Sequence, residues 1–134
     1  MAFMSNHRQL LQLLRSDYNR RCADCDAFLT DSSQIWACIE FGAFVCASCS
    51  AFHRQLGIHK RKDESVQFHN WTAKDVHAMS VAGNQLVNQI YERYVPPDWV
   101  KPGAEASPAE REFWVRAKYL DRYFMVPDAA NRSV

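Results

Sequence analysis

The stretch that decides the fold is Cys22-Ala23-Asp24-Cys25, followed by the similar stretch Cys46-Ala47-Ser48-Cys49. Twenty residues separate these two Cys-x-x-Cys pairs. Two residues between cysteines allow a tight turn to direct both sulfurs at one centre, and tetrahedral zinc takes four thiolates at about 2.3 Å each. The spacing therefore predicts one zinc ion held by Cys22, Cys25, Cys46 and Cys49. Because four thiolates leave no position for water, this zinc is expected to be structural.

Other interpretations of the cysteines stay open. The four could be reduced, buried thiols without a metal. A redox pair fits less well, because no βαβ pattern surrounds either Cys-x-x-Cys. His53 follows Cys49 by four residues, so on a helix it would share that face and could replace one sulfur ligand. The fifth cysteine, Cys38, lies in the apolar run 35–39 and is expected to be a small buried side chain.

Length and composition describe one globular domain. The chain has 134 residues, of which 48% are hydrophobic and 13% aromatic, enough to fill a core. The formal net charge of +1 argues against a general preference for nucleic acid or membrane surfaces. The first residues show no basic-then-apolar secretory pattern, so we expect a reducing, cytoplasmic environment and no disulfides.

The N-terminal half of the chain predicts short elements around the cysteines. Ser5 can cap a first helix that fades near Tyr18. Two short strands, 35–41 and 43–46, are expected on either side of Gly42. A helix over about 47–56 should follow, with Gly57 at its end, and a further short strand is expected at 66–68.

The C-terminal half predicts three more helices. Thr72 caps the first, and an apolar stripe at 86, 87, 90, 91 and 94 marks the second. Ser107 starts the last, which Pro127 ends and whose buried face should include Phe113, Trp114 and Phe124. We expect an α+β fold, a small antiparallel sheet surrounded by about five helices and stapled by one four-cysteine zinc finger. The domain should span residues 1–126, with a disordered C-terminal tail at 127–134.

Several motifs together resemble the Arf GTPase-activating protein domain. They are Cys22-Ala-Asp-Cys25, Trp36-Ala37, the stretch from Gly42 to Ser50, His53-Arg-Gln-Leu-Gly-Ile-His59 and Trp71-Thr72. Two later stretches agree, Gly83-Asn84 through Glu92 and Phe113-Trp114 through Tyr119. The resemblance covers about residues 8–125. The His-Arg-x-Leu-Gly-x-His run, four residues after the last cysteine, makes it specific.

The chain also departs from that family's pattern. The gap between the Cys pairs is about four residues longer than usual, and the proline usually found before the tryptophan is missing. Ala51 replaces a glycine, Lys60-Arg61 replaces an Ile-Ser pair, Glu64 replaces a basic residue and His69 replaces an aspartate. These changes bear on partner choice and catalytic strength more than on the fold.

The resemblance implies a role for Arg54 as an arginine finger. In this family the domain is thought to supply an arginine in trans to a bound GTPase, where it stabilises the charge that develops on the γ-phosphate. A planar guanidinium can meet two phosphate oxygens at once, which lysine cannot. Arg54 lies five residues after Cys49, so helical rotation turns it away from the metal. The resemblance places Trp36 beneath or beside it, although Trp36 could equally be plain core.

The resemblance further implies a GTPase activator that hydrolyses nothing itself. Its expected partner is a GTP-bound Arf-family small GTPase, contacted through Trp36, Leu56, Gly57, Lys60 and Arg61. The basic residues 60–62 could instead form a solvated turn or touch anionic lipid. We expect a monomer that does not bind nucleic acid, located in the cytoplasm and recruited to Golgi or endosomal membranes in vesicle trafficking, with a transient membrane contact through the partner. Two alternatives remain, a catalytically weak or inactive interaction domain of the same fold and a four-cysteine nucleic-acid-binding zinc finger.

Overall fold

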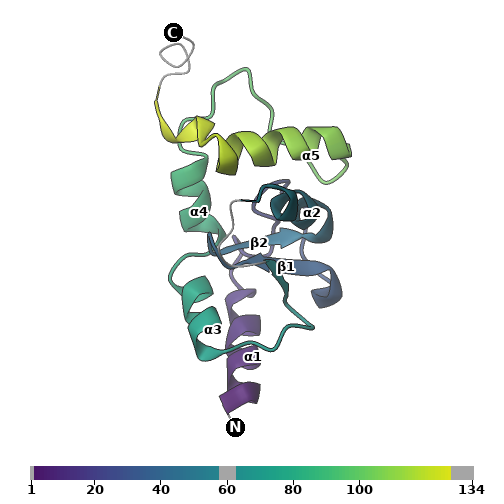
Figure 1. Ribbon diagram of the computed structural model, residues 1–134, viewed down its shortest axis with the longest axis vertical. Coiled ribbons are helices and arrows are strands. Elements are labelled where there is room, and N and C mark those ends of the chain that lie inside the picture. The colour runs from purple at the N-terminus through teal and green to yellow at the C-terminus, as the bar shows by residue number, and fades with distance from the viewer. Residues whose placement is uncertain (1, 58–62, 128–134) are drawn as a thin grey trace.

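The computed structural model describes residues 2–57 and 63–127 and places a small sheet between two groups of helices. The strands β1 (Ile35–Cys38), β2 (Ala43–Cys46) and β3 (Asp63–Ser65) are antiparallel, in the order β2-β1-β3. Figure 1 shows α1 (Ala2–Leu13) and α3 (Ala73–Ser80) at one end and α5 (Pro108–Val115) at the other. The described residues thus form the expected α+β fold, with five α-helices and three antiparallel strands.

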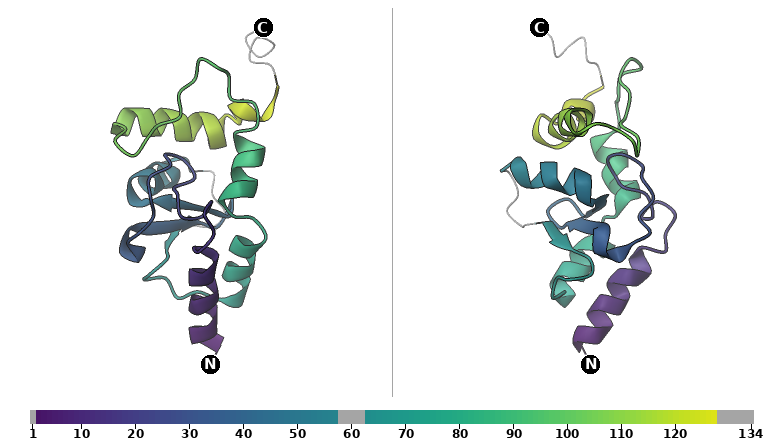
Figure 2. Two further views of the ribbon diagram at one scale, coloured as in Figure 1. Left: turned by 180° about the vertical axis from the view of Figure 1, so that it is seen from behind. Right: turned by 90° about the vertical axis from the view of Figure 1, so that its right-hand side faces the viewer.

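The remaining helices connect these layers. Helix α2 (Ala47–Gln55) continues directly from β2 and packs under α5, while α4 (Asn84–Tyr91) runs from the α3 end toward the α5 end (Figures 1 and 2). Short 3-10 helices at Ser32–Gln34 and Tyr123–Met125 and a π-helix at Arg116–Leu120 complete the described elements. None of these helices has the length and apolar composition that a membrane span needs.

Capping residues begin two helices as expected. Thr72 Oγ1 accepts a hydrogen bond from the Asp75 amide at the start of α3. Ser107 and Glu110 form a reciprocal capping box at the start of α5. These bonds satisfy helix amides that have no partner inside the helix.

Some element boundaries differ from the expectation. The first helix begins at Ala2, so Ser5 lies inside it. The strand from Ile35 ends at Cys38, because the amides of Phe41 and Gly42 both turn back to the Cys38 carbonyl. The third strand is Asp63–Ser65 and not 66–68, since the Ser65 hydroxyl and carbonyl accept bonds from the next turn.

The predicted buried faces of the later helices are also partly wrong. Phe113 is 63% exposed and stacks on Trp99 at 5.2 Å, whereas Trp114 and Phe124 are buried as expected. Leu86 and Ile90 are exposed on α4, where one face alone meets the core. The last helix changes to π geometry after Val115, well before Pro127. Of the tail predicted at 127–134, residues 128–134 lie outside the described residues.

Asn84 joins three parts of the chain at the start of α4. Its side-chain amide donates to the carbonyls of Arg21 (2.7 Å) and Phe44 (3.0 Å), and its Oδ1 accepts from the Phe44 amide (2.7 Å). Its backbone amide donates to Asn19 Oδ1 at 2.8 Å. One buried side-chain amide thereby supplies hydrogen-bond partners to backbone groups just before the first Cys pair and in the strand that leads to the second.

Candidate functional site: a four-cysteine centre beside an exposed arginine

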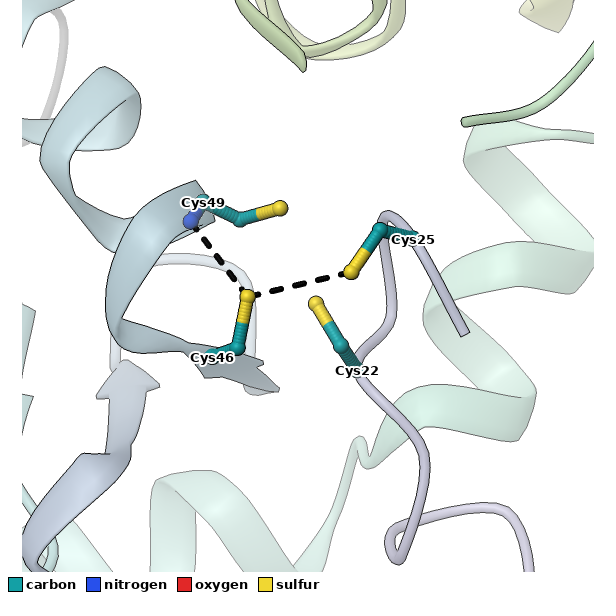
Figure 3. A group of neighbouring side chains, drawn as sticks. All are labelled: Cys22, Cys25, Cys46 and Cys49. Atoms are coloured by element: carbon teal, nitrogen blue, oxygen red, sulfur yellow. Dashed lines mark hydrogen bonds between the residues drawn. The ribbon is translucent and has the colours of Figure 1, made fainter. Parts of the chain in front are cut away.

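The four cysteines of the two Cys-x-x-Cys pairs converge on one point. Their sulfur atoms all lie within 4.8 Å of one another, and three of the residues are buried while Cys46 is half-buried. Figure 3 shows the sulfurs of Cys22 and Cys25 facing those of Cys46 and Cys49. Cys25 and Cys46 place their sulfurs 3.7 Å apart. A tetrahedron with zinc–sulfur bonds of about 2.3 Å has edges of roughly 3.8 Å, so the donor set and its size both fit zinc.

Local backbone geometry explains the convergence. Cys46 is the N-cap of α2, and its sulfur accepts a hydrogen bond from the Cys49 amide at 3.5 Å. In the first pair, the Asp24 amide points at Cys22 Sγ at 3.4 Å. Backbone N–H groups directed at sulfur favour the thiolate, which is the form that binds metal. Both turns therefore orient a sulfur toward the common centre and supply an N–H group that would stabilise its metal-bound thiolate form.

His53 does not belong to this cysteine group. Its side chain is fully buried, and Nε2 lies 2.6 Å from Asp24 Oδ2. A second buried group brings His53 together with Cys38 and Asp63. There the Cys38 thiol and the Ser50 hydroxyl both donate to Asp63 Oδ2, at 3.2 and 3.0 Å. Cys38 is buried as expected, and burial next to Asp63 raises the pKa of its thiol.

A buried ionic cluster lies directly behind the first Cys pair. Lys118 is fully buried, and its Nζ donates to Asp24 Oδ1 (2.9 Å), Glu92 Oε2 (2.6 Å), Asn88 Oδ1 (2.7 Å) and the Ala23 carbonyl (2.9 Å). Burial opposes the charge on both partners, but their attraction outweighs it. The pKa of Asp24 is held below its ordinary value by Lys118 and His53, and that of Lys118 is raised by Asp24 and Glu92. Both groups are therefore ionised at neutral pH.

Arg54 is exposed on α2, one residue after the buried His53. Its guanidinium carbon lies 4.7 Å from the centroid of the Trp36 ring, a cation–π arrangement. Trp36 is in the central strand β1, paired with Val45 of β2 and Ser65 of β3. The ring is thus carried by a backbone that is hydrogen-bonded on both sides, and it restricts the orientation of the guanidinium above it.

The other predicted contact residues fall in different settings. Leu56 is buried in the core, and Gly57 ends α2 with a φ of 70°. Lys60 and Arg61 lie outside the described residues. Two of the departures from the family pattern contact each other, because Glu64 Oε2 and His69 Nδ1 are 3.1 Å apart.

Sequence reasoning missed two charged residues next to the cysteines. Lys118 follows Trp114 by four residues, which places it on the face of the last helix expected to be buried, and that spacing was a usable signal. Arg111 Nη1 lies 3.3 Å from Cys49 Sγ and 3.7 Å from Cys46 Sγ. No pattern in the sequence pointed to that contact across 62 residues.

Comparisons with known proteins agree with this geometry. Residues 7–128 match the ArfGap family model, described as "Putative GTPase activating protein for Arf". The chain is 37% identical over 131 residues to ADP-ribosylation factor GTPase-activating protein AGD12 of Arabidopsis thaliana, covering 97% of this chain and 38% of that protein. It is 34% identical over 110 residues to stromal membrane-associated protein 1 of Homo sapiens, covering 82% of this chain and 22% of that protein. The chain therefore spans well under half the length of these relatives.

Solved structures share the fold. The ArfGap domain of HIV-1 Rev binding protein superposes with a TM-score of 0.79 at 22% identity, covering 99% of this chain and 96% of that one. The ArfGap domain of human RIP has a TM-score of 0.77 at 24% identity, covering 92% of this chain and 88% of that one. The two converging Cys-x-x-Cys pairs, the Arg54–Trp36 pair and the match over nearly the whole length lead to one assignment: this chain belongs to the ArfGap family.

Proposed function

We propose that this domain stimulates GTP hydrolysis by an Arf-family small GTPase, with Arg54 as the arginine supplied in trans. The observation that carries the proposal is the exposed guanidinium of Arg54 over the Trp36 ring. An arginine finger needs access to the partner and little freedom to reorient, because ordering a long side chain on binding opposes the gain. The cation–π contact, worth about 0.5–2 kcal/mol, removes part of that freedom before the partner binds.

Helix α2 carries the arginine and is fixed at three points. Its N-cap is Cys46 and it contains Cys49, both of the cysteine centre, and His53 anchors its later part to Asp24. We propose that the centre holds one zinc ion through Cys22, Cys25, Cys46 and Cys49. Bound there, zinc supplies a structural cross-link and no reactive position, because four thiolates complete its shell.

The chemistry at Arg54 is electrostatic. As the γ-phosphoryl group transfers, negative charge spreads over its oxygens, and two guanidinium N–H groups can donate to two of them. The nucleotide, its Mg²⁺ and the attacking water all belong to the partner. The domain itself therefore needs no nucleophile or general base, and its contribution is made mainly in the transition state.

A single-turnover assay with a panel of GTP-loaded Arf-type GTPases tests this proposal. At saturating domain, Arg54→Ala should lower the stimulated rate by roughly 10³–10⁵-fold, and Arg54→Lys should recover little of it. Binding to the GTP-loaded partner should fall far less than turnover. Arg15→Ala, which removes an exposed arginine after α1, is the matched control and should keep the wild-type rate. Equal stimulated rates with and without Arg54 would assign the chemistry to another residue.

A non-catalytic interaction domain is the second candidate. Its support is that two departures from the family pattern, Glu64 and His69, contact each other beside the edge strand β3, on the face of the sheet opposite to that of the Trp36 side chain. Rates at the intrinsic GTPase level for wild type and Arg54→Ala, across every GTPase in the panel, would favour this candidate. Restored stimulation in Glu64→Lys would identify the carboxylate as the cause.

We further propose that the domain works as a monomer in the cytoplasm and meets its partner at Golgi or endosomal membranes during vesicle trafficking. The support is the ArfGap family assignment and the name of the relative stromal membrane-associated protein 1. Flotation with liposomes should recover the domain when GTP-loaded Arf is attached to them. Recovery on bare liposomes of the same lipids would contradict recruitment through the partner.

A further inference from the structure

Arg111 brings a full positive charge to the cysteine centre from a distant part of the chain. It lies on α5 and is only 7% exposed. Nη1 donates to Cys49 Sγ at 3.3 Å and approaches Cys46 Sγ at 3.7 Å. Both sulfurs belong to the second Cys pair at the start of α2, so the contact spans the packed interface between α2 and α5.

The rest of the guanidinium is held by the connector before α5. Nη2 donates to the Ala104 carbonyl at 2.7 Å, and Nε donates to the Ala106 carbonyl at 3.3 Å. All three guanidinium nitrogens therefore have a partner, and the planar group has one orientation that satisfies them together. The N–H groups near sulfur are positioned by the backbone as well as by attraction to the thiolates.

Charge balance explains why the centre needs this residue. Four thiolates and one Zn²⁺ leave a net charge of −2, and a buried charge without a counter-charge is costly. Backbone amides, among them those of Asp24 and Cys49, also donate to these sulfurs, but they are neutral. Among the described donors, Arg111 is the one with a formal positive charge.

We propose that Arg111 is the outer-sphere charge partner of the zinc–thiolate centre, a positioning residue that stabilises the thiolates of Cys46 and Cys49 and makes zinc binding depend on α5. The inference rests on the proposed zinc site. It extends the role of the centre, because zinc then links the first and second Cys pairs to a helix that supplies no ligand. Outer-shell partners of this kind typically change metal affinity by 10–100-fold.

The test measures zinc affinity by competition with a chromophoric chelator, using the whole chain. Arg111→Met keeps much of the apolar stem and removes the charge, and should weaken zinc binding by about 10–100-fold. Arg111→Lys should fall between it and wild type, because a point charge cannot reproduce the fork of N–H groups. Arg116→Met, which removes an exposed arginine in the following π-helix, is the matched control and should stay within about twofold of wild type.

Cobalt substitution adds a readout that packing alone would not move. Hydrogen bonds to a thiolate lower the energy of its lone pairs, so losing them should shift the sulfur-to-cobalt charge-transfer band to longer wavelength in folded Arg111→Met. Wild-type affinity and an unshifted band in that variant would overturn the inference. If Arg111→Met does not fold even in excess zinc, Arg111→Lys decides by the same two measurements: weaker zinc binding with a shifted band supports the role, and wild-type values overturn it. Absence of zinc from folded wild-type protein would instead refute the zinc site itself.

Discussion

Replacing Lys118 by methionine should be among the most destabilising single changes in this domain. The substitution keeps most of the side-chain stem but removes the charge that holds Asp24, Glu92, Asn88 and the Ala23 carbonyl together at 2.6–2.9 Å. Asp24 is fully buried and the side chain of Glu92 is 13% exposed, so both carboxylates would lose a counter-charge in poorly solvated positions. Removing one partner of a buried ion pair costs about 3–5 kcal/mol of the free energy of unfolding.

The environment of Asp24 sets the estimate within that range. Asp24 would keep the Tyr119 hydroxyl at 2.6 Å and His53 at 2.6 Å, and Glu92 would keep Lys101 at 3.0 Å. Because these contacts still stabilise the two carboxylates, we expect a loss of about 3–4 kcal/mol in the free energy of unfolding, the lower part of that range. Domains of this size have a free energy of unfolding of about 5–15 kcal/mol, so the variant would lose a fifth or more of it.

Urea unfolding in excess zinc, followed by circular dichroism, measures the loss. Lys74→Met removes an exposed lysine on α3 and should stay within about 0.5 kcal/mol of wild type. The double variant Lys118→Met with Asp24→Asn should lose at least about 1 kcal/mol less free energy of unfolding than the sum of the two single losses. The reason is that Asp24→Asn removes the buried carboxylate that Lys118→Met leaves without a counter-charge. A loss below about 1 kcal/mol for Lys118→Met would show that the cluster is not electrostatically coupled to folding.

Four further outcomes can be checked on the same protein. Cys25→Ser should lose zinc in metal analysis while Cys38→Ser keeps it; the reverse would mean that the ligand set is wrong. Gly42→Ala should lower the free energy of unfolding by more than about 1–2 kcal/mol, since φ is +82° there and a Cβ would collide with that of Ala82, and a near-neutral urea midpoint would contradict this. Ser107→Ala should cost about 0.5–2 kcal/mol through loss of the cap at α5, with Ser107→Asp as the rescuing variant. Because the pKa of Asp24 is depressed in the folded state, its ionised form stabilises the fold above about pH 4, and this stabilisation is lost as pH falls. The difference in free energy of unfolding between wild type and Asp24→Asn should therefore narrow from pH 5 to pH 3. A difference that widens over this range would contradict a depressed pKa.

Local patterns in the sequence predicted those parts of the molecule that local chemistry determines. The Cys-x-x-Cys spacing predicted the cluster, and the caps at Thr72 and Ser107 predicted two helix starts. The zinc ion and the role of Arg54 stay predictions until the assays are done. Apolar periodicity was less reliable for Phe113, which stacks on Trp99 at the surface. Periodicity predicts which side of a helix is apolar, but it does not show which residues on that side are covered by the rest of the protein.

The interactions that the sequence could not predict are long-range and polar. Arg111 reaches sulfurs more than sixty residues away, and Lys118 reaches Asp24 across 94 positions. Such contacts depend on how the helices pack, and a lone Arg or Lys in a helical pattern is most often a solvated charge. The structure was needed to show that these two are buried beside the first and second Cys pairs.

The position of Asn84 has a consequence for how the protein is made. Residues 19–49 contain both Cys pairs, yet the carbonyls of Arg21 and Phe44 depend on an amide at position 84 for their hydrogen bonds, and Asp24 depends on Lys118. At roughly 5–20 residues per second, the ribosome adds the roughly 70 residues from Cys49 to Lys118 in several seconds. The four thiols of the two Cys pairs are therefore synthesised several seconds before Lys118, and a fragment cut after the second Cys pair would lack these buried partners permanently.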